Sequence, residues 1–266
     1  MPRERSGERP WEIAPDVYCL GPSGRTQTNV YFVREGSSWA LIDAGWASDG
    51  ARIDRAAKSL LDATARPTAI LLTHCHPDHS GAARYLAGLW NCPVYMHARE
   101  LPIANGDFAA MQVSAGPLDR YVVLPFLRLI GRRRREAILA ASRLGDVGRT
   151  IEPGAAVPSL PAWECIATPG HTPGHVAYFR RQDRVLVSGD ALATFKINSV
   201  WGLLLARDGL SGPPWYTTWN REAARRSIRI LADLNPCVLA GGHGRPLLGG
   251  QTAAVLRSFA AGFAGG

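Results

Sequence analysis

The chain contains 266 residues, of which 46% are hydrophobic and 20% are charged. This composition excludes an intrinsically disordered chain, and the length allows a sizeable core in one large α/β domain or in two smaller ones. Five widely spaced cysteines exclude a disulfide framework, and residues 1–9 lack the apolar stretch of a secretory signal. We therefore expect a cytoplasmic protein.

The formal net charge is +8, with 28 arginines and only two lysines. Such an excess is found in proteins that bind nucleic acids or anionic membranes. Here the arginines are dispersed outside one cluster at 132–135, and aromatic and basic residues do not alternate as they do in RNA-binding segments. We therefore interpret the arginines as solvated surface and expect no nucleic-acid partner.

Along the chain, short apolar runs predict strands, and apolar residues that recur on one helical face predict helices. The expected strands are 30–35, 39–43, 69–72, 94–96, 163–167, 176–180 and 185–188. The expected helices are 49–63, 78–89 and 222–234, and the last would bury Ala223, Ile230, Leu231 and Leu234. Strands and helices mixed in this way indicate layered α and β packing.

Three of the seven histidines fall within six residues, in the segment 73–79, THCHPDH. The segment lies where a buried strand is expected to emerge into a loop, so that His74 and His76 can converge on one centre while Asp78 and His79 point to a second. Imidazole and carboxylate donors of this kind suit Zn²⁺. Strand alternation would turn Cys75 to the opposite face, as a packing residue.

Other segments place a histidine or a carboxylate at the end of an apolar run or within a turn. These residues are Asp43, His171, His175, Asp190 and His243. Each is weak evidence alone, but together they indicate metal donors collected at strand ends. His97 follows the expected strand 94–96, and both a structural role and a position facing a pocket remain open for it.

This ordered set of residues resembles the metallo-β-lactamase fold superfamily, from about residue 29 to about residue 244. The resemblance implies an αββα sandwich, with two mixed sheets face to face and helices outside, and a single hydrolase domain over 1–266. It also implies two divalent metal ions, zinc first, with manganese or iron as alternatives.

The same resemblance implies the metal ligands. One ion would be held by His74, His76 and His171, and the second by Asp78, His79 and His243. Asp190 would bridge the two. Asp43 would lie behind the ligands and orient them, and His175 would also lie behind the ligands or be structural.

Two ions can activate a shared water as hydroxide and polarise a carbonyl or phosphoryl oxygen, which is hydrolysis of a small-molecule substrate. Asp78 could shuttle a proton. An aspartate at the position of Asp190 is similar to glyoxalase II and lactonase-type enzymes and argues against β-lactamases proper. Only 23 residues follow His243, so the glutathione-binding region of glyoxalase II is absent or much reduced. We expect cleavage of an ester, lactone or thioester.

Two alternatives share the fold. One is a mononuclear iron enzyme similar to persulfide dioxygenases, with iron on His74, His76 and Asp190; the other is a phosphodiesterase. A non-catalytic protein would lack ligands, and none is missing here. The aromatic segment 213–216 and Trp201 could form a wall of the substrate pocket or belong to the core.

The interval between His79 and His171, about 90 residues, exceeds what one helix and strand need. We expect a helical lid insertion at about 101–149. A helix on an anionic membrane surface and a homodimer contact are alternatives. The apolar run 122–130 is too short to span a bilayer, so no stable membrane insertion is expected.

Overall fold

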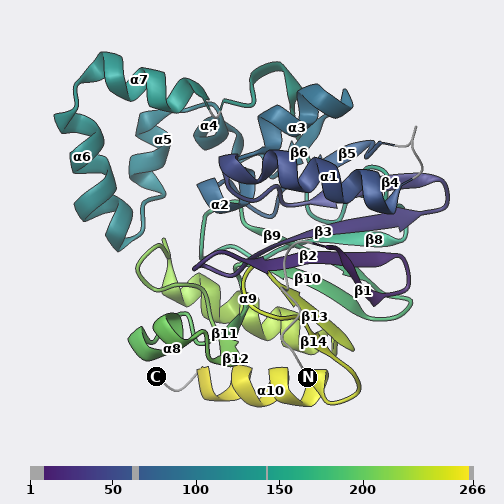
Figure 1. Cartoon of the computed structure of the whole chain (residues 1–266). Helices are drawn as coiled ribbons and strands as arrows, with labels where there is room; N and C mark the ends of the chain where they lie inside the picture. Colours follow the sequence, from purple (N-terminus) through teal and green to yellow (C-terminus); the bar gives the residue numbers. More distant parts are fainter. Residues whose placement is uncertain (1–8, 62–65, 142, 264–266) are drawn as a thin grey trace.

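Two β-sheets lie face to face in the computed structural model, which describes residues 9–61, 66–141 and 143–263 (Figure 1). The first is mixed, with its strands side by side in chain order. They are β1 Trp11–Ala14, β2 Val17–Ser23, β3 Thr28–Glu35, β4 Ser38–Ile42, β5 Ala69–Leu71, β6 Val94–Met96 and β7 Gly148–Thr150. β1 to β4 pair antiparallel, and β4 to β7 pair parallel.

The second sheet has the order β14-β13-β10-β9-β8. Its strands are β8 Trp163–Ala167, β9 Val176–Arg180, β10 Val185–Gly189, β13 Val238–Gly241 and β14 Leu247–Leu248. β10 and β13 run parallel, which places their carboxyl ends at the same edge. β11 Ala193–Phe195 and β12 Asp208–Ser211 form a separate antiparallel pair.

Three apolar layers hold this arrangement together. Side chains from both sheets, among them Ile42, Tyr178 and Val187, form the central core. α1 (Gly50–Leu60) and α3 (Ala83–Trp90) pack on the outer face of the first sheet. α9 (Arg221–Asp233) and α10 (Thr252–Phe263) pack on the outer face of the second. The expected αββα sandwich is therefore confirmed (Figure 1).

The expected helix at 78–89 is wrong in one respect, because it is broken into α2 (Pro77–Ser80) and α3. Gly81 lies between them, and a Cβ there would come within 2.5 Å of the Ala47 nitrogen in the short helix η1 (Ala47–Asp49). Gly81 keeps helical backbone angles, and the change of direction comes at Ala82, where ψ is 0°. This turn gives Asp78 and His79 a helix of their own.

Two details of the expected helices also differ. α1 ends at Leu60, and the expected end at Ala63 lies outside the described residues. In α9, Ile230 was expected to be buried but is 47% exposed, whereas Ala224, Ile228 and Leu231 face the core. The apolar stripe of α9 therefore runs through 224, 228 and 231, a spacing that winds away from Ile230.

Residues 101–141 and 143–147 form an arch of short helices that projects beyond the sandwich (Figure 1). They are α4 Leu101–Ala104, α5 Phe108–Val113, a π-helical turn Asp119–Val123, α6 Leu124–Leu129, α7 Arg132–Ala141 and the turn Gly145–Val147. The chain then returns to the first sheet as β7, a strand that the sequence did not predict. No helix among the described residues is long and apolar enough to cross a bilayer.

Candidate metal centre

The candidate site lies where strands of the two sheets end. Asp43 follows β4, and the loop with His74 and His76 follows β5; β4 and β5 are parallel neighbours, so both segments emerge at one edge. Asp190 follows β10 and His243 follows β13, which are parallel neighbours in the second sheet. The fold therefore gathers residues from four segments that lie far apart in the sequence, at 43, 74–76, 190 and 243.

The histidine and carboxylate atoms form three overlapping groups, each with its atoms within 4.8 Å of one another. The groups are His74, His76 and His171; His74, His79 and Asp190; and Asp78, His79 and His243. Every metal ligand expected from the sequence falls in one of them. His74 and His79 belong to two groups each, so the site is one continuous cluster of donors.

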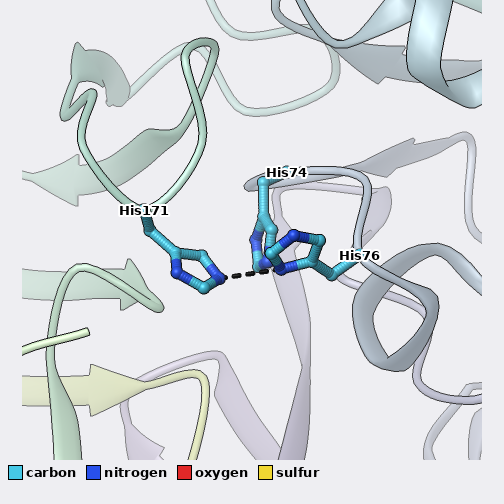
Figure 2. Close-up of side chains that lie close together, drawn as sticks. All are labelled: His74, His76 and His171. Atoms are coloured by element: carbon cyan, nitrogen blue, oxygen red, sulfur yellow. Dashed lines mark hydrogen bonds between the residues drawn. The ribbon is translucent and has the colours of Figure 1, made fainter. Parts of the chain in front are cut away.

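Figure 2 shows how the first group converges. His74 and His76 reach in from one loop and His171 from another, and the Nδ1 of His76 lies 2.8 Å from the Nε2 of His171. His74 is fully buried and His171 is 1% exposed. Two imidazole nitrogens this close, in a site that is largely closed to solvent, either share a proton or direct lone pairs at a common cation.

Asp190 lies between the two ends of the cluster. Its Oδ1 is 3.2 Å from the Nε2 of His79 and 3.2 Å from the Nε2 of His243, while its Oδ2 is 3.3 Å from the Nε2 of His171. Asp78 completes the far end, with its Oδ2 3.5 Å from the Nε2 of His243. One carboxylate therefore faces the histidines of both donor sets.

Asp43 lies behind the histidines and determines which of their nitrogens face the site. Its carboxylate accepts hydrogen bonds from the Nδ1 of His79 at 2.8 Å and from the backbone and hydroxyl of Thr73 at 2.8 and 2.9 Å. Because the Thr73 hydroxyl gives its one proton to Asp43, it can only accept from the Nδ1 of His74, 3.1 Å away. Both Nε2 atoms are thereby left for the site.

His175 lies beside the cluster and outside its donor groups. Its Nε2 accepts a hydrogen bond from the backbone N–H of Asp190 at 3.1 Å, and its Nδ1 lies 2.7 Å from the hydroxyl oxygen of Thr168. Burial lowers its pKa to about 3, so the ring stays neutral. His175 therefore holds the backbone of Asp190 in place.

The charges of the cluster favour a cation. Burial alone lowers the pKa values of His79 and His243, but the carboxylates of Asp190 and Asp78 outweigh it and raise both. Burial raises the pKa of Asp190, yet His243 and His79 outweigh it and hold that pKa well below its usual range. The carboxylates therefore favour a positive charge at this position. In the metal-free protein, bound protons on the histidines provide that charge.

The donor set fits divalent metal ions. Among the described residues, the buried atoms without a hydrogen-bond partner include the Nε2 of His74 and of His79 and the Oδ1 of Asp190. Burial lowers the pKa of His74 and of His171, so both imidazoles are neutral. Neutral imidazoles and carboxylates with free lone pairs are the donors that such ions require.

Glu100 is a buried residue of this region that the sequence did not reveal. It is fully buried, and its carboxylate accepts hydrogen bonds from the backbone N–H of Cys75 at 3.0 Å and of Gly174 at 2.8 Å. A glutamate after a short strand carries no sequence signal of its own. Only its position between two loops distinguishes it.

Two other expectations concern the surroundings of the cluster. Cys75 is buried with its Sγ 3.7 Å from the Sδ of Met96, away from the histidines, although it lies in a loop and not in a strand as expected. His97, whose role was open, lines a cavity of about 460 Å³ together with Glu152, Pro169 and His175. Its Nε2 is 3.8 Å from Glu152.

The aromatic residues suggested for a pocket wall have different positions. Trp201, in α8 (Val200–Leu205), is 67% exposed and Trp215 is 50% exposed, so neither belongs to the core. Tyr216 is partly buried, and burial together with the charges of Asp190 and Asp78 raises its pKa. Of these three aromatic residues, Tyr216 is therefore the one that interacts electrostatically with the carboxylates of the cluster.

The chain resembles known proteins over most of its length. A model of the metallo-beta-lactamase superfamily matches residues 23–243. The chain is 38% identical to the probable metallo-hydrolase YflN of Bacillus subtilis over 226 residues, which are 83% of this chain and 82% of that protein. It is 29% identical to a hydroxyacylglutathione hydrolase of Marinomonas sp. over 153 residues, 55% of this chain and 41% of that protein.

Solved structures agree with the fold. TTHA1623, described in a di-iron-bound form, is 27% identical, with a TM-score of 0.56 over 88% of this chain and 96% of its own. TTHA1429 from Thermus thermophilus, described as a metallo-beta-lactamase family protein, has a TM-score of 0.64 over 94% of this chain and 80% of its own at 21% identity, which shows the fold alone. By its sequence and its fold, this chain belongs to the metallo-β-lactamase superfamily.

Proposed function

We propose that the protein is a metal-dependent hydrolase that holds two divalent ions and cleaves a carboxylic ester, lactone or thioester. The observation that carries this proposal is the position of Asp190, whose two oxygens lie 3.2 to 3.3 Å from histidines of both donor sets. A carboxylate so placed can serve two ions at once. The similarity to metallo-hydrolases supports the same reaction class.

The ligand sets are those expected from the sequence. His74, His76 and His171 would hold one ion, and Asp78, His79 and His243 the other. When bound, two divalent ions would supply an activated water as nucleophile and would polarise the scissile carbonyl. Zinc suits these donors, and the di-iron-bound form described for TTHA1623 supports iron as an alternative.

Of the two carboxylates in the cluster, Asp78 is the more exposed, and Asp190 is only 4% exposed. The side chain of Asp78 is 16% exposed, whereas those of His79 and His243 are 0% and 3% exposed. A carboxylate at the boundary between the buried donors and solvent can take a proton from the nucleophile and release it to water or to the leaving group. We therefore assign the proton transfer to Asp78.

The substrate class is supported by relatives and by the chemistry of the site. Hydroxyacylglutathione hydrolases, which match about half of this chain, are named for a thioester substrate. The partly buried Tyr216, next to the charged cluster, could contact an acyl group at the mouth of the site. Esters, lactones and thioesters share the same tetrahedral intermediate at carbon, so they belong in one screen.

The first test is elemental analysis of protein purified without added metal, followed by a screen of lactones, thioesters, esters and phosphodiesters. We expect about two ions per chain and turnover of a carboxylic substrate. Asp190→Asn should abolish most turnover, while Asp208→Asn, an exposed aspartate in β12, serves as the matched control.

Three results would contradict the proposal. One iron per chain with oxygen consumption on a persulfide would favour the oxygenase alternative. Cleavage of phosphodiesters alone would favour the phosphodiesterase. Failure to bind metal after reconstitution with zinc, manganese or iron would exclude all three activities.

A further inference from the structure

Two loops supply the ligands of the first donor set, and hydrogen bonds from the backbone join them on two sides of the contact between His76 and His171. The backbone N–H of Val176, at the start of β9, donates to the carbonyl of Thr73 at 2.9 Å. On the other side, Glu100 accepts from Cys75 and from Gly174, one carboxylate oxygen for each loop. Cys75 lies between His74 and His76, and Gly174 lies three residues after His171.

The loop that carries His171 contains hydrogen bonds between its own backbone groups, which connect the region of Gly174 to the turn of His171. The backbone N–H of Thr168 donates to the carbonyl of His175 at 3.0 Å, and that of Gly170 donates to the carbonyl of Thr172 at 3.0 Å. Further along, the backbone N–H groups of Trp219 and Asn220 donate to the carbonyls of His171 and Gly170 at 3.0 and 2.8 Å, which hold the loop toward α9. Glu100 and Val176 are the contacts that fix it relative to the loop of His76.

Gly174 is fitted closely to Glu100. A Cβ at position 174 would lie 2.8 Å from both Cγ and Oε1 of Glu100 and 3.1 Å from the Cβ of Arg99. No side chain fits there unless Glu100 moves. The contact can therefore be disturbed from either partner.

Asp43 and Glu100, two buried carboxylates near the cluster, contact different residues of the ligand loops. Asp43 contacts His79 directly and reaches His74 through Thr73. Glu100 contacts neither of these side chains, and its partners belong to the loops of His76 and His171. The first donor set is thus the one that Glu100 spans.

We propose that Glu100 is a positioning residue that sets the distance between His76 and His171 and thereby the affinity of the first donor set for its ion. A carboxylate can accept from two N–H groups at once, whereas a carboxamide offers only one acceptor oxygen. A buried N–H left without an acceptor is unfavourable, so the two loops would shift apart at this point and change the geometry between His76 and His171. The inference rests on the proposed metal-binding function.

The experiment titrates metal-free protein with Co²⁺ in the presence of a competing chelator and records the visible absorption of the bound ion. For Glu100→Gln we expect the dissociation constant of one ion to rise by about 10- to 100-fold, the usual range for groups that orient ligands, while that of the other changes by less than about threefold. The absorption bands of the weakened site should shift, because its ligand geometry changes.

The matched control is Asp54→Asn. Asp54 is also a buried carboxylate with two partners, the Nε1 of Trp90 at 3.0 Å and the Nζ of Lys58 at 2.5 Å, but it packs between helices of the outer layer. This variant should lower the melting temperature and leave both cobalt affinities and the spectrum unchanged. A loss of general stability is thus separated from a loss of ligand geometry.

Gly174→Ala is a second variant that keeps the carboxylate and displaces it sterically. It should weaken the same ion, and the double variant Glu100→Gln/Gly174→Ala should be no weaker than the worse single variant, because both changes break one contact. Wild-type affinity for both ions in folded Glu100→Gln or Gly174→Ala would overturn the inference, and so would equal weakening of both ions. A wild-type protein that binds no cobalt would instead overturn the proposed function itself.

Discussion

The backbone N–H of Asp190 donates a hydrogen bond to the Nε2 of His175 over 3.1 Å, so a buried imidazole holds the carboxylate that faces both donor sets. This role requires a neutral ring, because a protonated Nε2 would be a donor facing a donor. The lowered pKa of His175, about 3, satisfies this requirement.

The same pKa predicts how stability depends on pH. The unfolded chain protonates His175 below about pH 6.5, and the folded protein does so only near pH 3, so the free energy of unfolding should decrease as the pH falls through this window. One such group contributes at most about 1.4 kcal/mol per pH unit. Metal-free wild type and His175→Gln should be compared by denaturant unfolding at pH 7, 6 and 5. If the free energy of unfolding depends on pH equally in the variant and the wild type, His175 takes up its proton at the same pH in the folded and the unfolded protein, and its pKa is not lowered.

Asp43 offers a test of how the nitrogens are directed into the site. In Asp43→Asn the amide cannot accept from His79 and from both groups of Thr73 as the carboxylate does. Both ions should bind about 10- to 100-fold more weakly, since His79 and His74 serve different donor sets. Chelator competition followed by elemental analysis measures this. Selective loss of the ion held by Asp78, His79 and His243 would show that the link through Thr73 to His74 is unimportant, and unchanged affinity for both ions would refute the role of Asp43 altogether.

Cys75 and His76 are neighbours with opposite expected effects. His76→Ala removes a donor of the first set and should eliminate most activity and lower the metal content. Cys75→Ser should leave both nearly intact, because the thiol packs against Met96 and burial raises its pKa well above the ordinary value, which disfavours the thiolate ligand. Metal content that falls in Cys75→Ser as far as in His76→Ala would refute this orientation of the thiol.

The helical arch at 101–147 should influence substrate binding, if it is a lid. It contacts the segment next to the site, where the backbone N–H of Leu118 donates to the carbonyl of Tyr216 at 2.6 Å. A Cβ on Gly116 would lie 2.3 Å from the backbone of Thr217, so Gly116→Ala must displace the arch. We expect KM to rise by roughly tenfold with unchanged metal content.

Gly88→Ala is the control for this substitution, because a Cβ at this position of α3 would meet no atom of the described residues within 4 Å. The two other roles of the arch have their own signatures. Exposed side chains such as Tyr121, Phe126 and Leu129 could contact a second copy or a lipid surface. Unchanged KM with a shifted sedimentation coefficient would indicate a dimer contact, and unchanged KM with weaker binding to anionic vesicles would indicate a membrane surface.

Layered α and β packing and most of the candidate donors could be predicted from the pattern of residues, whereas the sandwich and the grouping of the donors into two sets came from the resemblance to the metallo-β-lactamase superfamily. Metal donors directly after buried strands have few other reasons to be there, and the ends of parallel neighbouring strands meet at one edge. His74, His76, Asp78 and His79 lie within six positions of one another, so their proximity can be predicted without knowing how distant segments pack.

The role of Glu100, the break after α2 and the exposed side of α9 became visible only in the folded chain. Glu100 contacts residues 25 and 74 positions away, and no local pattern encodes such a contact. The close approach of Gly81 to Ala47 involves the loop after β4, and the exposure of Ile230 depends on how α9 lies against its sheet. Each depends on packing between segments remote in sequence, where side-chain shape and not periodicity selects the arrangement.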